Sequence, residues 1–144
     1  MKIKVLLLFL LISLSAGAQV DKMLGKWDSV DDKSGVKRST VYIYKAVNGK
    51  YYGKILCLYV PNGDGTYTTL TESPAGYEGV IGMVILRDLV PDGGDLKGRC
   101  YDPESKKTYY GKISYNANKN TVTLRGSIDK LGLIGRSQTW VRSE

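Results

Sequence analysis

The stretch Gly98-Arg-Cys-Tyr-Asp-Pro-Glu-Ser-Lys-Lys-Thr-Tyr-Tyr-Gly-Lys-Ile113 is typical of a β-hairpin. Asp102 can accept a hydrogen bond from the backbone two residues on, and Pro103 presets the φ angle of the next turn position. The flanking residues alternate, as they do in strands with one buried face. The faces expected to be buried hold Gly98 and Cys100 before the turn, and Tyr109, Gly111 and Ile113 after it.

Similar alternating segments, separated by turn signals, cover most of the remaining chain. Asn48-Gly49 is a strong hairpin signal, and Asp92-Gly93-Gly94-Asp95 is a second turn. The expected strands outside the 98–113 hairpin are 25–29, 36–46, 51–60, 79–88, 121–128 and 136–142, with a long loop over 61–78. About eight strands joined by short hairpins predict an all-β fold, an up-and-down antiparallel barrel or a closely related sandwich.

The N-terminus has the pattern of a secretory signal peptide. Lys2 and Lys4 precede an apolar run over 5–14, and Ala16-Gly17-Ala18 supplies a cleavage site. The run is too short to span a bilayer comfortably; the alternative is a buried core helix. We expect a signal peptide over 1–18, a single domain over 19–144 and an exported protein, periplasmic or secreted, with no membrane span after cleavage.

The excess of basic over acidic residues is modest. The formal charge is +7, and removal of Lys2 and Lys4 would lower it to +5. Lysines and arginines are spread along the sequence, which favours a solvated surface over a nucleic-acid site. Attraction to acidic glycans, an anionic membrane surface or another envelope protein stays open.

The residue types limit the available chemistry. The chain has no His, which removes histidine-based nucleophile systems and the commonest zinc sites. Asn62-Gly63-Asp64-Gly65 lacks the ordered acids and closing Glu of a calcium loop. Asp102 has a complete turn-forming explanation. We therefore expect no metal and no cofactor, and the sequence leans against an enzyme.

Two cysteines, Cys57 and Cys100, both fall in expected strands. The alternation in the third strand places Gly53, Ile55, Cys57 and Tyr59 on one face. Export would permit a disulfide, and the alternative is two small buried thiols.

The last strand carries an unusual face. If this face lines a cavity, its arginines can hold a carboxylate or phosphate head while aromatic rings contact an apolar body. If it faces solvent, the same residues form cross-strand pairs, which is the favoured reading. The candidate ligand-binding residues are Arg125, Arg136, Gln138, Trp140, Arg142 and Tyr109.

Several segments, in order along nearly the whole mature chain, resemble the bacterial family called domain of unknown function 2147. They are Gly25-Lys26-Trp27, Asp31-Asp32, Tyr52-Gly53-Lys54-Ile55, Gly79 to Leu86, Asp102-Pro103-Glu104-Ser105, Arg125-Gly126 and Gly135 to Arg142. The resemblance implies an exported single-domain β protein with no assigned activity. This chain departs from it at Lys106, where the family commonly has Gly, and in a middle loop without the cysteine pair of many relatives.

The opening Gly25-Lys26-Trp27 is also similar to the Gly-x-Trp motif of lipocalins. In that family the Trp closes the barrel base under a basic residue from a late strand. The resemblance implies a structural role for Trp27, with Arg125, Arg136 and Arg142 as candidate partners.

Three functions remain in view. The first is a non-enzymatic barrel that binds an apolar or amphipathic ligand, lipid-like or acidic. The second is an envelope module whose Tyr-rich outer face docks on glycan, membrane or protein. The third is an enzyme without His, which would need a cavity carboxylate with a raised pKa.

Overall fold

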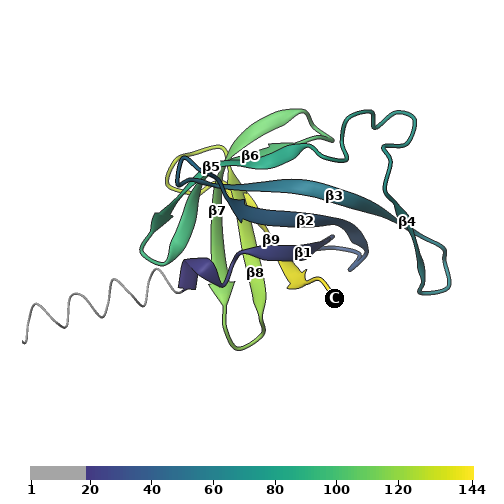
Figure 1. Ribbon diagram of the computed structural model, residues 1–144, viewed down its shortest axis with the longest axis horizontal. Helices are drawn as coiled ribbons and strands as arrows, with labels where there is room; N and C mark the ends of the chain where they lie inside the picture. Colours follow the sequence, from purple (N-terminus) through teal and green to yellow (C-terminus); the bar gives the residue numbers. More distant parts are fainter. Residues whose placement is uncertain (1–18) are drawn as a thin grey trace, which may run out of the picture.

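The computed structural model describes residues 19–144, which form a β-barrel (Figure 1). The expected signal peptide, residues 1–18, lies outside the described residues. The strands assigned within 19–144 are β1 (Gly25–Val30), β2 (Lys37–Lys45), β3 (Tyr51–Pro61), β4 (Tyr67–Leu70), β5 (Val84–Asp92), β6 (Asp95–Asp102), β7 (Lys107–Asn116), β8 (Thr121–Ser127) and β9 (Gly135–Arg142). No helix in that part of the chain has the length and apolarity needed to cross a membrane.

Eight of these strands close on themselves. Each neighbouring pair is antiparallel, in the circular order β1-β2-β3-β5-β6-β7-β8-β9, and β9 returns to β1 with Trp27 opposite Arg142. The predicted antiparallel barrel of about eight strands is confirmed.

Strand β4 differs from the loop expected over residues 61–78. It pairs only with the end of β3 and forms an arm beside the barrel, on the right in Figure 1. The turn at 62–66 is closed by the backbone amide of Asn62, which donates to the Thr66 carbonyl at 3.0 Å. The Tyr-Thr-Thr run that follows favours a strand.

The barrel interior is occupied by a hydrophobic core. Trp27 is fully buried and Trp140 is 2% exposed, and both belong to a single cluster with buried side chains from all eight barrel strands. Trp27 donates from Nε1 to the Met23 carbonyl at 2.8 Å, which ties the N-terminal turn to the barrel end. Each fully buried Leu, Ile, Val or Met contributes roughly 1.5–3 kcal/mol. The core residues are Val20, Met23, Trp27, Val41, Ile43, Tyr51, Ile55, Val80, Ile85, Leu86, Leu89, Leu96, Cys100, Ile113, Val122 and Trp140.

A bulge in β3 reverses which face of the sheet each side chain in the second half of the strand lies on. Val41 lies opposite Ile55, but the preceding Thr40 lies opposite Cys57, so β3 has one extra residue at this point. The extra residue turns Cys57 and Tyr59 to the outer face, where the Tyr59 hydroxyl lies 2.6 Å from Thr40 Oγ1. The prediction that they share a face with Ile55 is wrong for that reason.

Cys57 and Cys100 are both free thiols in the structure, so the considered disulfide is absent. Gly53 and Cys100 both lie opposite Leu86, on either side of β5. Cys57 is four residues further along β3, about 13 Å at about 3.3 Å per residue. Bridged Cα atoms lie within about 7 Å, so the two strands would have to move.

The hairpin between β6 and β7 has the turn chemistry that the sequence predicts. Asp102 Oδ1 accepts from the Glu104 amide at 3.0 Å, and the Lys106 amide donates to the Asp102 carbonyl at 2.8 Å. Lys106 has a φ of 58°, the left-handed conformation in which a non-glycine residue costs roughly 1 kcal/mol.

Candidate functional site

A second bulge, in β5, shapes the outer wall of the barrel. Arg87 lies opposite Arg99, and the next paired residue, Val90, lies opposite Lys97, so Asp88 and Leu89 both face Gly98. Leu89 is fully buried, whereas Asp88 has a φ of 52° and an exposed side chain. The bulge therefore places Leu89 in the core and the adjacent Asp88 on the surface.

Gly98 makes this bulge possible. A Cβ atom at Gly98 would lie 2.6 Å from the Arg87 carbonyl oxygen and 2.8 Å from the Asp88 carbonyl oxygen. Only glycine leaves room for β5 to press so closely on β6.

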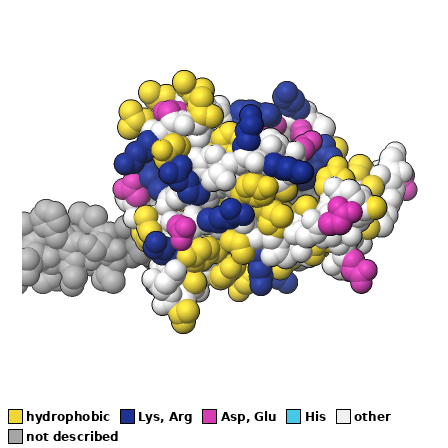
Figure 2. Space-filling view, turned by 90° about the horizontal axis from the view of Figure 1, so that it is seen from above, with side chains coloured by type: hydrophobic (Ala, Val, Ile, Leu, Met, Phe, Trp, Pro, Cys, Tyr) yellow, Lys and Arg dark blue, Asp and Glu magenta, His cyan; other side chains and the backbone are white. Residues whose placement is uncertain are grey.

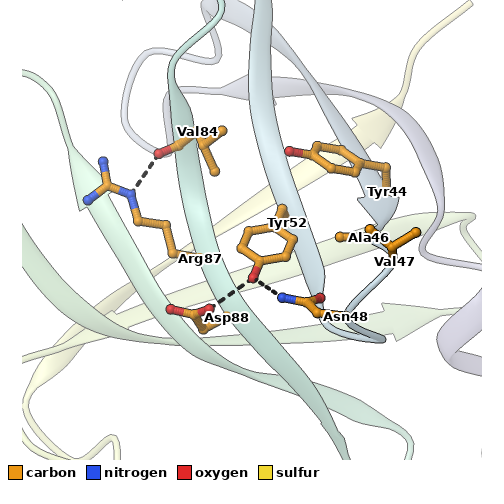
Figure 3. Close-up of a pocket in the computed structure, with 8 residues that line it drawn as sticks. All are labelled: Tyr44, Ala46, Val47, Asn48, Tyr52, Val84, Arg87 and Asp88. Atoms are coloured by element: carbon orange, nitrogen blue, oxygen red, sulfur yellow. Dashed lines mark hydrogen bonds between the residues drawn. The ribbon is translucent and has the colours of Figure 1, made fainter.

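The Asp88 bulge forms one side of a hollow on the outer surface (Figure 3). The hollow has a volume of about 460 Å³ and is shallow and broadly open to solvent. The Tyr52 hydroxyl accepts from Asn48 Nδ2 at 2.8 Å and donates to Asp88 Oδ1 at 2.9 Å, which joins β3, its turn and β5. The hollow is lined by Tyr44, Ala46, Val47, Asn48, Tyr52, Val84, Arg87 and Asp88.

A row of tyrosines leads into this hollow along the outer face of β2 and β3. Tyr42 stacks on Tyr44 with 5.6 Å between ring centroids, and Tyr44 stacks on Tyr52 at 6.0 Å. The ammonium group of Lys54 lies 6.0 Å and 5.6 Å from the centres of the first two rings. The rings therefore form a stacked aromatic row with a positive charge beside it.

Arg87 and Arg99 form the basic side of the same surface. The Arg87 guanidinium lies 4.8 Å from the Tyr101 ring centre and donates from Nε to the Val84 carbonyl at 2.8 Å. The Arg99 guanidinium lies 3.9 Å from the Tyr110 ring centre. Each side chain is thus held in place by an aromatic ring.

Neither of these arginines has an acidic partner in the described part of the chain: no carboxylate there lies within 4.0 Å of either guanidinium. The neighbouring Lys97 and Lys112 do have partners, at 2.8 Å and 3.4 Å. Like charges directly opposite one another destabilise a sheet, so an anion placed here would be stabilising. Figure 2 shows Lys and Arg side chains, with hydrophobic ones between them, on the face that is uppermost in Figure 1, where β3, β5 and β6 lie.

The residues that the sequence suggests for ligand binding are not gathered in one site. Trp140 is in the core and donates from Nε1 to Gln138 Oε1 at 3.1 Å, and Tyr109 packs against the same core. Arg136 is exposed and makes two hydrogen bonds to Asp32, at 3.0 Å and 3.1 Å.

The other two suggested arginines bind backbone carbonyls. Arg125 donates from Nε to the Gly132 carbonyl at 2.6 Å, in the loop between β8 and β9. Arg142 lies at the opposite end of β9, with its guanidinium 3.7 Å from the Trp27 ring centre. Arg142 also donates to the carbonyls of Leu24 at 2.9 Å and Lys22 at 2.7 Å, so its donors hold the N-terminal turn.

The resolved pKa shifts of the described carboxyl groups are all downward. Amide donors from Ser34 and then Lys33 lower the pKa of Asp31 to about 2. Hydrogen bonds likewise lower the pKa values of Asp64, Glu78, Asp92 and Asp129. These carboxyl groups are therefore ionised at neutral pH, and they are better suited to accept structural hydrogen bonds than to donate a proton in catalysis.

The closed barrel with a tryptophan in its first strand, under an arginine from its last, defines a lipocalin-like barrel. The chain belongs to the family of uncharacterized proteins conserved in bacteria (DUF2147), whose model matches residues 25–142.

A solved structure with a similar fold is protein HP1028 from the human pathogen Helicobacter pylori, described as belonging to the lipocalin family. It is 23% identical, with a TM-score of 0.61, over 85% of this chain and 83% of that chain. No curated protein matches the sequence significantly. The fold is compatible with ligand binding.

Proposed function

We propose that this chain is an exported, periplasmic or secreted, non-enzymatic protein that binds a small amphipathic anion on the outer face of its barrel. The observation that carries the proposal is the hollow of about 460 Å³ beside two arginines without acidic partners. The apolar part of the ligand would lie against Tyr44, Tyr52 and Val84, and its anionic group beside Arg87 and Arg99.

The position of the hollow favours the outer face over the barrel interior. Trp27, Trp140 and the aliphatic core occupy the space that an internal ligand would need. On the outer face, Tyr52 is already fixed by two hydrogen bonds, so its ring costs little further entropy on binding.

A binding role is also favoured over catalysis. Hydrogen bonds lower the pKa values of Asp31, Asp64, Glu78, Asp92 and Asp129, whereas a histidine-free enzyme would use an acid with a raised pKa. The thiol of Cys100 is held neutral, because burial and then the charge of Asp102 raise its pKa to about 11.

The test is a fluorescence titration with 1-anilinonaphthalene-8-sulfonate, an aromatic sulfonate with the expected combination of apolar rings and a negative charge. The double variant Arg87→Gln, Arg99→Gln should weaken binding at least tenfold. The matched control is Lys97→Gln, Lys112→Gln, which removes the same charge from neighbouring strands where each lysine has an aspartate partner. The control should change the affinity less than twofold.

A second variant, Val47→Glu, adds a negative charge at a fully exposed turn position of the hollow. We expect it to weaken binding without changing the thermal midpoint. Equal affinity in the wild type and both test variants would overturn the proposal, as would equal losses in the arginine and lysine pairs. Native mass spectrometry of protein from its host should show a retained anionic mass that the arginine variant loses.

A further inference from the structure

The loop between β8 and β9 presents large aliphatic side chains to solvent. Leu131 is 84% exposed and Leu133 is 76% exposed, and two isoleucines flank them. Figure 2 shows a group of hydrophobic side chains projecting at the upper left, the side on which Figure 1 places this loop. The exposed aliphatic residues of the loop are Ile128, Leu131, Leu133 and Ile134.

Hydrogen bonds from inside the loop fix its shape. Asp129 accepts from the amides of Leu133 at 2.9 Å and Ile134 at 2.7 Å, through different carboxylate oxygens. The Ser127 hydroxyl donates to the Asp129 carbonyl at 2.8 Å, and the Ile128 amide donates to the Ile134 carbonyl at 3.0 Å. The loop therefore holds its aliphatic side chains outward without support from a partner.

Arg125 completes this arrangement from β8. Its Nε donates to the Gly132 carbonyl at 2.6 Å, and its Nη2 donates to the Leu133 carbonyl at 3.4 Å. Backbone groups beside the exposed leucines are thus already paired within the protein. Such pairing is what a segment needs to enter a medium without water, because an unpaired backbone group there is costly.

These features favour a lipid surface as the partner. Side chains exposed by 62% to 84% project together from one loop, as aliphatic side chains that enter a bilayer must. Lys130 lies beside the tip, and the formal charge of the chain without residues 1–18 is +5. Exposed aliphatic side chains with Lys130 beside them and Arg125 at the base of the loop match an anionic membrane interface.

We infer that the β8–β9 loop anchors the protein on an anionic bilayer by inserting Leu131 and Leu133 at the boundary between the lipid headgroups and the acyl chains. The inference is independent of the proposed ligand site, because the loop shares no residue with the hollow. It places residues 19–144, in which no helix is long and apolar enough to cross a bilayer, at a membrane surface.

The test is cosedimentation with vesicles of phosphatidylglycerol and phosphatidylethanolamine, compared with vesicles of phosphatidylcholine. The wild type should bind the anionic vesicles, and the variant Leu131→Ser, Leu133→Ser should lose at least tenfold in partitioning. The matched control, Val60→Ser, Val90→Ser, removes aliphatic side chains that are 46% and 44% exposed elsewhere. It should stay within twofold of the wild type, and all three proteins should keep the same thermal midpoint.

A second measurement reports insertion itself. Trp27 and Trp140 are buried, so in the variant Leu131→Trp only the new indole can meet lipid. We expect its emission to shift to the blue on anionic vesicles and to be quenched by brominated acyl chains. Absent binding by the wild type, unchanged partitioning of the serine variant, or an unquenched indole would each overturn the inference.

Discussion

Replacing Gly98 by alanine tests whether the β5 bulge depends on a missing side chain. The new Cβ would lie 2.6 Å and 2.8 Å from the carbonyl oxygens of Arg87 and Asp88. These are backbone atoms, so β5 must move rather than rotate a side chain. Overpacking of this kind costs about 1–3 kcal/mol, which for a domain of this size lowers the thermal midpoint by roughly 3–15 °C.

The matched control is Gly111→Ala, directly across the ladder from Gly98. A Cβ there meets its nearest atoms at 3.4 Å, an ordinary contact, so the midpoint should move by only a few degrees. Calorimetry gives both midpoints, and the Asp88 amide resonance reports the bulge. Equal midpoints for Gly98→Ala and Gly111→Ala would refute the account of the bulge. An unshifted Asp88 resonance in Gly98→Ala would refute it as well.

Three further predictions follow from other contacts. Arg142→Ala should cost about 2–3 kcal/mol in urea unfolding, because two charge-assisted hydrogen bonds and a cation–π contact are lost, whereas Arg136→Ala should cost less than about 1 kcal/mol. Burial raises the pKa of Cys100 to about 11 and shields its thiol, so thiol reagents should label the less buried Cys57 first. The free energy of unfolding should fall from pH 9 to 11, because the Cys100 thiol ionises at a lower pH in the unfolded chain than in the folded one. Asp129→Ala should speed hydrogen exchange at the two loop amides that it accepts from, and unchanged exchange would contradict its role.

Local rules were sufficient to predict most of the barrel. Alternating residues and the turns at Asn48-Gly49 and Asp102-Pro103 depend on neighbours in sequence, and the structure keeps both hairpins. The bulges could not be predicted in this way. The one in β3 depends on the register against β2, which turned Cys57 outward and separated it from Cys100.

The candidate site was missed for the same reason. Arg87 and Arg99 are twelve residues apart, and only the β5–β6 register places them opposite each other. The pairing of Tyr44 with Tyr52 did have a signal, because the Asn48-Gly49 turn fixes that register. Sequence reasoning favoured Arg136 and Arg142, whose donors are taken by Asp32 and by backbone carbonyls.

The two proposals share a physical origin in the filled barrel. Trp27 and Trp140 occupy the interior, so both proposals use side chains that lie on the outer face of the sheet or in a loop beyond its edge. Strand β5 supplies the first kind, because Arg87 lies against the Tyr101 ring on the outer face while Leu86 and Leu89 stay in the core. In the β8–β9 loop, Asp129 and Arg125 hydrogen-bond the backbone and hold the aliphatic side chains beyond the edge of the sheet. Because each device is fixed by hydrogen bonds before any ligand or membrane arrives, little conformational entropy is left to lose on binding.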